Sequence, residues 1–169
     1  MTQTIIDYIV GIFQGNVPEE LIIFLTSMLP VVELRGGMIA AKLLGVELHK
    51  AFVICYIGNI IPIPFILLFI RKIFEFLKKF KPTEKIVTRL ETSSLRKSEK
   101  VKKTSKWGLL TFVAIPLPGT GGWTGALIAA LLDMRIKISF PVIALGVLIA
   151  NLIMSLFSYG FLGLLGVGG

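Results

Sequence analysis

The chain has 169 residues, 54% of them hydrophobic, and a mean hydropathy of +0.85. This composition excludes an ordinary water-soluble domain and makes lipid the expected solvent. The net charge of +8 is confined to one region: residues 71–106 carry 13 Lys or Arg and 4 Glu, whereas the rest of the chain sums to −1. A short basic loop between apolar runs is typical of the cytoplasmic side, so we predict lipid partners and no nucleic acid.

The first predicted element is an amphipathic helix at residues 1–16. Apolar side chains recur there at helical spacing, but the segment is too short to cross a bilayer, so we expect it to lie at the membrane interface. The segment has no basic region before its apolar run and carries Asp7. It therefore does not match a cleaved signal peptide.

Residues 18–73 form the first predicted repeat. Its apolar run contains the stretch LPVVELRGGMIAA (29–41), which includes Glu33 and Arg35. A straight transmembrane helix would place both charges near mid-membrane, at about 2.5–3.5 kcal/mol each. A re-entrant broken hairpin avoids this cost because its tip is buried in protein. We expect a spanning helix to follow from His49 to Lys72, kinked by its prolines.

A basic cytoplasmic loop at 74–106 and a second repeat at 107–166 complete the predicted order. The second repeat carries a broken stretch without charge, IPLPGTGGWTGALIAA (115–130), and a long apolar run from 138 onwards. Residues 36–48 can be superposed on 125–137, which pairs Gly36 with Gly125. A broken hairpin followed by a spanning helix is thus used twice.

The predicted fold is an all-α integral membrane protein with a single domain over 1–169. If the basic loop is cytoplasmic, the two spanning helices run in opposite directions and the two hairpins open to opposite sides. We therefore expect an inverted repeat of re-entrant hairpin plus transmembrane helix, with the interfacial helix in front. The expected location is the plasma membrane, with several passes. The alternative is four ordinary spans with kinks.

Small residues four apart, such as Gly37 with Ala41 and Gly125 with Ala129, are predicted to let helices approach closely in lipid. Asn59 and Asn151 lie inside the spans, and we expect each of them to form a hydrogen bond between helices. Cys55 is the only cysteine. Neither a disulfide framework nor a metal cluster is predicted.

Glu33 and Arg35 leave two interpretations open. They could pair with each other or cap a broken helix end without any chemistry. An ionisable residue inside the membrane is otherwise a functional hypothesis: Arg35 could hold an anionic group, and Glu33 could carry a proton. The candidate residues of the substrate or proton path are Pro30, Glu33, Arg35, Gly36, Pro116, Pro118, Gly119, Thr120, Gly121, Trp123 and Thr124. No catalytic residue, metal ligand or cofactor is predicted.

These two broken stretches resemble those of the small multi-drug export protein family over almost the whole chain. The family is in turn distantly similar to the DedA/VTT superfamily, with which it shares PLPG at 116–119. That likeness implies two facing re-entrant hairpins and translocation of polyprenyl-phosphate carriers or phospholipids. DedA-type proteins are expected to carry an acid in one hairpin and bases in the other, whereas the second hairpin here is uncharged.

The leading functional prediction is a small exporter, proton-coupled, with a site between two re-entrant hairpins. Its expected substrate is a small amphipathic or anionic lipid-like molecule, and its size suggests a homodimer. The alternatives are a DedA-like lipid translocase or scramblase and a membrane scaffold that transports nothing. An intramembrane phosphatase is disfavoured, because its chemistry needs more acids and a nucleophile.

Overall fold

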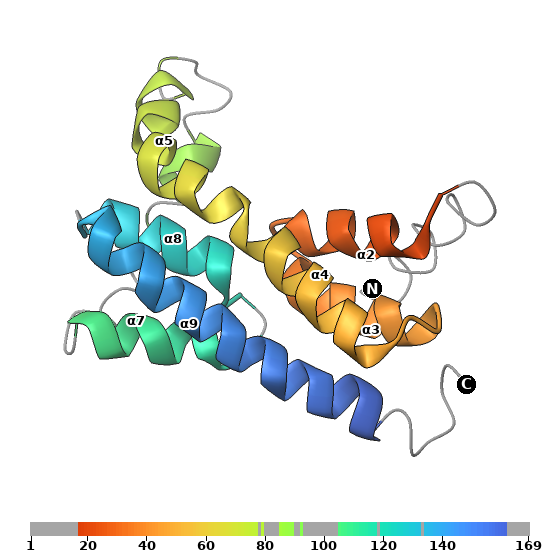
Figure 1. Ribbon diagram of the computed structural model, residues 1–169. Helices are drawn as coiled ribbons and strands as arrows, with labels where there is room; N and C mark the ends of the chain where they lie inside the picture. The colour runs from red at the N-terminus through yellow and green to blue at the C-terminus, as the bar shows by residue number, and fades with distance from the viewer. Residues whose placement is uncertain are drawn as a thin grey trace. The chain divides into compact units, whose positions relative to one another are not determined.

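The structure is a computed structural model that describes residues 17–77, 79, 85–89, 92, 105–117, 119–132 and 134–161. Every regular element in these ranges is helical (Figure 1). The bounds are α2 Glu19–Met28, α3 Glu33–Leu43, α4 Leu48–Ile60, α5 Pro62–Leu77, α7 Ser105–Ala114, α8 Gly122–Leu131, α9 Ile136–Ser155 and the π-helix η1 Leu156–Phe161. The predicted all-α class is confirmed for this part of the chain. The interfacial helix predicted at 1–16 and most of the loop at 74–106 lie outside the described residues.

Two helical segments are long and apolar enough to cross a bilayer. They are Leu48–Ile70, with 23 residues, and Ile136–Phe161, with 26 residues. Both exceed the roughly 20 residues that a spanning helix needs, and both coincide with the predicted spans. The first is interrupted between Ile60, where α4 ends, and Pro62, where α5 begins. The break falls directly before Pro62, whereas Pro64 lies inside α5, so the predicted kink is matched by an interruption at the first of the two prolines.

The chain divides into two compact units. Unit 1 comprises residues 1–61 and 147–169, and unit 2 comprises residues 62–146. Each unit therefore contains one pair of short helices and parts of both long helical segments. Unit 1 holds α2, α3, α4, the second part of α9 and η1; unit 2 holds α5, α7, α8 and the first part of α9.

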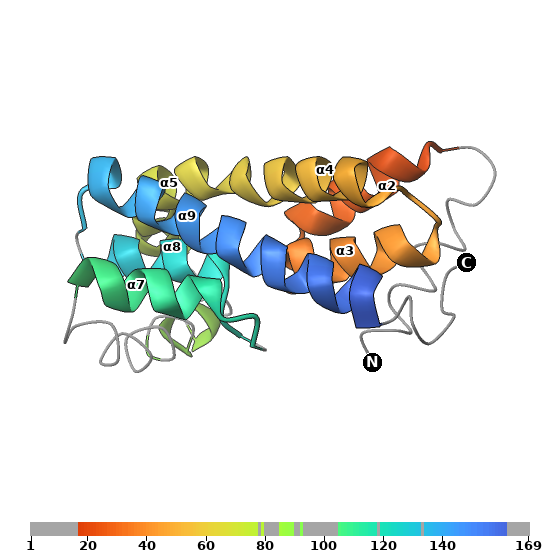
Figure 2. The same ribbon diagram turned by 60° about the horizontal axis from the view of Figure 1, so that its bottom comes forward.

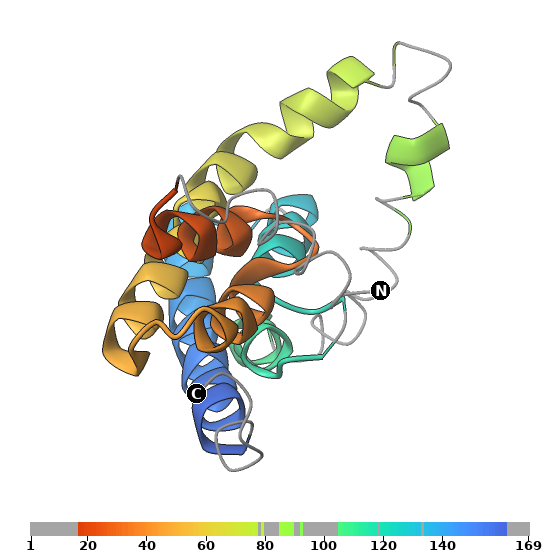
Figure 3. The same ribbon diagram turned by 90° about the vertical axis from the view of Figure 1, so that its right-hand side faces the viewer.

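In unit 1, α2 and α3 form a helical hairpin and α4 packs against both (Figure 3). Gly37 of α3 makes this packing possible, because a Cβ there would collide with Ser27 Oγ of α2 and lie 3.0 Å from Cys55 Sγ of α4. A Cβ at Gly58 of α4 would lie 2.7 Å from the carbonyl oxygen of Phe24. The two glycines thus set how closely the three helices approach.

The second part of α9 and η1 are joined to α4 and to the loop before it. Asn151 Nδ2 donates to the carbonyl oxygen of Phe52 at 2.8 Å, and the Tyr159 hydroxyl donates to that of Val46 at 2.6 Å. The Lys42 ammonium lies 5.8 Å from the centre of the Tyr159 ring, within the range of a cation–π contact. The predicted interhelical hydrogen bond of Asn151 is confirmed.

In unit 2, α7 and α8 form the second helical hairpin, and α8 also packs against α5 (Figure 2). A Cβ at Gly125 of α8 would collide with Val113 of α7 and lie 3.9 Å from Ile143 of α9. A Cβ at Gly146 of α9 would lie 2.8 Å from Val113 Cβ and 3.2 Å from the carbonyl oxygen of Leu110. Glycines therefore set the helix approach in this unit too.

The same packing arrangement occurs in both units. The counterparts in the first hairpin arm are 86 residues apart: Ile23 and Leu109, Phe24 and Leu110, Ser27 and Val113. Those in the second arm and the long helix are 88 apart: Gly37 and Gly125, Cys55 and Ile143, Gly58 and Gly146. The contacts thus correct the sequence superposition by one residue. Gly37 faces both neighbouring helices, whereas Gly36 lies against Val32 of its own tip.

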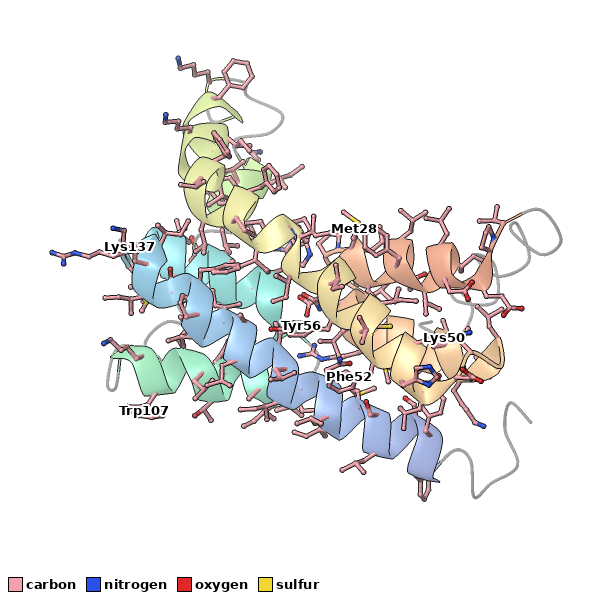
Figure 4. The ribbon with its side chains drawn as sticks, viewed as in Figure 1. Met28, Lys50, Phe52, Tyr56, Trp107 and Lys137 are labelled. Carbon is pink, nitrogen blue, oxygen red and sulfur yellow. The ribbon has the colours of Figure 1, made fainter. Side chains whose placement is uncertain are left out.

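The first turns of the two long segments carry basic side chains. Figure 4 labels Lys50 in the first turn of α4 and Lys137 in the first turn of α9. Lys50 Nζ lies 3.7 Å from Glu47 Oε2, and His49 Nε2 lies 3.5 Å from the same oxygen. All three of these side chains are more than half exposed. They are placed as expected for polar groups at a membrane boundary.

Candidate functional site

The tip of the first hairpin is a tight turn between α2 and α3. The Leu29 N–H donates to the carbonyl oxygen of Thr26 at 3.2 Å, and the Glu33 N–H donates to that of Leu29 at 2.9 Å. Pro30 is exposed, and Val31 is 88% exposed. The turn therefore reverses the chain within four residues, and α3 begins directly at the acidic residue.

Glu33 combines burial with an unusual backbone conformation. Its side chain is 3% exposed, and its φ is +51°, the one positive value at a non-glycine residue among the described residues. A left-handed conformation costs an L-residue with a Cβ about 1–2 kcal/mol. Arg35 is half-buried, so burial disfavours its positive charge, and the negative charge of Glu33 partly offsets this effect. The two residues therefore influence each other electrostatically, and both interpretations of the pair stay predictions.

The tip of the second hairpin is a longer loop that Thr120 organises. Its hydroxyl lies within hydrogen-bonding distance of the carbonyl oxygens of Ile115, at 2.7 Å, and Leu117, at 2.8 Å. The Leu117 N–H donates to the same hydroxyl at 3.2 Å. These bonds hold the loop together, so the Thr120 side chain has a structural role in addition to any role in binding.

The residue that begins the second arm of this hairpin also has a positive φ. Gly121, the N-cap of α8, has φ +127°. It lies 88 residues after Glu33, the same separation that relates Gly37 to Gly125. Glycine adopts this conformation without the Cβ penalty. The first hairpin thus carries a glutamate at a position where the second has the residue that fits without strain.

The remaining candidates are divided between the two tips. Gly36 is buried in the first tip, against Val32. In the second tip Gly119 is exposed, and Pro116, Trp123 and Thr124 are half-buried. Pro118 lies outside the described residues. That the two tips share one site stays a prediction.

Buried polar side chains among the described residues are concentrated in unit 1. Unit 2 contributes only Ser139, whereas unit 1 contributes Thr26, Ser27, Glu33, Asn59, Asn151, Ser155 and Ser158. Thr26, Ser27 and Ser155 each donate to the carbonyl oxygen four residues earlier in their own helix, at 2.7 Å. Such bonds leave little capacity for a ligand. The remaining buried polar groups of unit 1 are Glu33, the two asparagines and Ser158, whose hydroxyl has no hydrogen-bond partner.

Asn59 corrects one prediction. Its side chain is fully buried, yet neither Nδ2 nor Oδ1 has a hydrogen-bond partner, so the predicted bond between helices is wrong at this position. The residue before it, Gly58, is the one that meets α2, because a Cβ there would lie 2.7 Å from the carbonyl oxygen of Phe24. The sequence signal that could have distinguished Asn59 from Asn151 is its place three residues before Pro62 and five before Pro64.

An open groove of about 740 Å³ lies on the surface of unit 1. Five of its seven lining residues are apolar, and the other two are His49 and Ser155; the apolar ones are Leu48, Phe52, Val53, Leu152 and Leu156. Glu33 and Arg35 do not line it. The groove is therefore mainly apolar, and its lining includes none of the candidate site residues.

Two apolar segments long enough to span a bilayer, together with paired short helices, are the features of a helical membrane protein, and its mainly apolar core contains one buried carboxylate among the described residues. The family model described as "Putative small multi-drug export protein" matches residues 33–153. The chain belongs to this family, whose name indicates an exporter and not an enzyme. No curated protein and no solved structure has significant similarity to the chain. The likeness to the DedA/VTT superfamily stays a prediction.

Proposed function

We propose that the protein is a proton-coupled exporter of small amphipathic or anionic lipid-like molecules. In this proposal Arg35 binds the anionic group and Glu33 takes up and releases the proton. The observation that carries it is the Glu33 carboxylate, buried in a left-handed conformation at the position where the second hairpin has Gly121. The family name supports export.

The strain at Glu33 supports a role beyond packing. If the position served only to start α3, glycine would start it without the Cβ penalty, as Gly121 does for α8. Strained residues persist where the surrounding structure holds them, and they cluster at functional sites. A buried carboxylate is tolerated when it is paired or when it accepts a proton. Glu33 fits both states: it is paired with the nearby Arg35 when ionised, and it is neutral when it carries a proton.

The lengths of the hairpin arms support a re-entrant arrangement. Arms of 10 and 11 residues rise about 15 Å, which is half of a hydrocarbon core about 30 Å thick. In the proposed topology both hairpins reach mid-membrane from opposite sides, because the basic loop between the spans stays in the cytoplasm. The recurrence of the packing contacts supports a repeat, and inverted repeats with broken helices are typical of transporters.

Arg35 provides the direct test of substrate binding. In proteoliposomes we expect Arg35→Ala to slow the movement of fluorescently labelled phosphatidylglycerol at least tenfold, since one charge-assisted pair is worth about 1.5–3 kcal/mol. Arg35→Lys should keep part of the rate because the charge remains. Labelled lipid and ethidium, an amphipathic cation, are followed in the same vesicles by fluorescence.

The outcomes separate the candidate functions. Arg135, an exposed arginine directly before α9, provides the matched control, and Arg135→Ala should transport normally. Equal rates for wild type and Arg35→Ala with both probes would contradict the proposed site. Movement of the lipid in both directions without a pH gradient would favour a scramblase, and no movement of either probe would favour a scaffold.

A further inference from the structure

Asn59 is a buried amide whose hydrogen-bonding capacity is not used by the protein. Its exposed fraction is 0%, and both polar atoms of the side chain lack a partner. By contrast, Asn151 uses its Nδ2 to join α9 to α4. Buried polar groups in proteins are nearly always hydrogen-bonded. A ligand would satisfy this amide, which lies inside a span with neither of its polar atoms bonded.

The backbone around Asn59 offers further oxygen acceptors. Pro62 and Pro64 have no N–H, so the carbonyl oxygens of Gly58 and Ile60 cannot accept the helical bond that a residue four positions later normally donates. These carbonyls flank Asn59 at the C-terminal end of α4, where the helix dipole is negative. Three oxygen atoms from consecutive residues are thus available at the interruption of the span.

The register of α3 and α4 places Glu33 at the same level. The two helices are neighbours joined by a four-residue loop, which makes them antiparallel. Gly37 contacts Cys55 across this pair. One turn towards the start of α3 is Glu33, and one turn towards the end of α4 is Asn59. The buried carboxylate and the buried amide therefore lie at corresponding heights on adjacent helices.

We infer that Asn59, the carbonyls of Gly58 and Ile60, and Glu33 form a binding site for a small monovalent cation within unit 1. Oxygen ligands at an interrupted transmembrane helix suit Na⁺ or hydronium. The other titratable or charged side chains on the packed elements near this level are Arg35, Cys55 and Tyr56, since Glu19 and Glu20 lie in the first turn of α2. The inference rests on the proposed function, because the cation would be the coupling ion.

The test measures cation-dependent stability, which needs no transported substrate. Purified wild type is melted in detergent with NaCl or choline chloride at equal ionic strength, and in choline chloride at acidic and alkaline pH. A bound ion raises the melting temperature by mass action, so we expect a rise of a few degrees with Na⁺ or, for hydronium, at acidic pH. Asn59→Leu should fold and lose this shift, whereas Asn59→Asp should keep or enlarge it.

Asn151→Leu is the matched control. It should melt lower in every buffer, because it loses the bond to Phe52, and it should keep the cation-dependent shift. The inference is overturned if Asn59→Leu shows the same shift as wild type, or if wild type responds to neither ion. A cation-dependent shift that wild type shows and Asn59→Leu loses, together with failed transport of both probes, would support the cation site and overturn the exporter.

Discussion

Glu33→Gly is expected to be more heat-stable than Glu33→Ala and equally inactive in transport. The backbone at this position has φ +51°, which glycine adopts freely and alanine does not. The difference should be about 1 kcal/mol, the lower end of the left-handed penalty. Both variants remove the carboxylate, so both should lose at least 90% of the pH-driven ethidium or labelled-lipid flux in proteoliposomes.

Glu33→Gln removes the negative charge of the side chain and keeps its shape. It keeps the size of the side chain and the strained backbone, so it should fold as wild type does and still lose pH-driven transport. Thermal unfolding in detergent and the flux assay are measured on the same preparations. Gly121→Ala is the control for backbone strain at the equivalent position of the second hairpin. It introduces a Cβ at φ +127° and should lower the free energy of unfolding. A Glu33→Gln variant with wild-type flux would show that the carboxylate has a structural role only.

The second large loss of stability is expected when the glycines that let the helices pack closely are replaced. Gly58→Ala and Gly146→Ala should each destabilise the protein by about 1–3 kcal/mol, the usual range for overpacking. At Gly58 the added Cβ would lie 2.7 Å from the carbonyl oxygen of Phe24, a backbone atom that cannot rotate away. At Gly146 it would lie 2.8 Å from Val113 Cβ. Fluorescence-detected melting in detergent measures both.

Gly160→Ala is the control for these substitutions. A Cβ there has no heavy atom within 4 Å, so its effect should stay within about 0.5 kcal/mol of zero. Similar losses at Gly58 and Gly146 would support equivalent packing roles in the two units. If Gly58→Ala melted like wild type, α4 would not be in close contact with α2, and the equivalence of the two units would be refuted.

The long helices and the hairpins could be predicted because their signals are local. A span is encoded by length and continuous hydropathy, and the breaks at residues 29–37 and 115–122 are encoded by proline and glycine. The structure has helices on both sides of each break, but the first break is shorter than predicted, because α3 begins at Glu33 and includes Arg35, Gly36 and Gly37. The small residues four apart were also informative, since Gly37, Ala41, Gly125 and Ala129 are all buried.

The site could be predicted only in part. Glu33 and Arg35 were conspicuous because charges are rare in apolar runs, but the positive φ of Glu33 depends on how the tip closes. Asn59 and Asn151 had the same expected role, and only one of them forms the bond. Hydrogen bonding between helices depends on which atoms a neighbouring helix presents. The π-helix at Leu156–Phe161 likewise had no recognised local signal.

The sequence by itself determined that this is a helical membrane protein of the small multi-drug export family, with two spans and two broken helical segments. Hydropathy, proline and glycine act over a few residues, so they can be read along the chain. Only the tertiary structure decided that Gly37 and not Gly36 faces both neighbouring helices, that Glu33 is strained, and that Asn59 is buried without a partner. These features depend on the distances between helices, which the sequence alone does not specify.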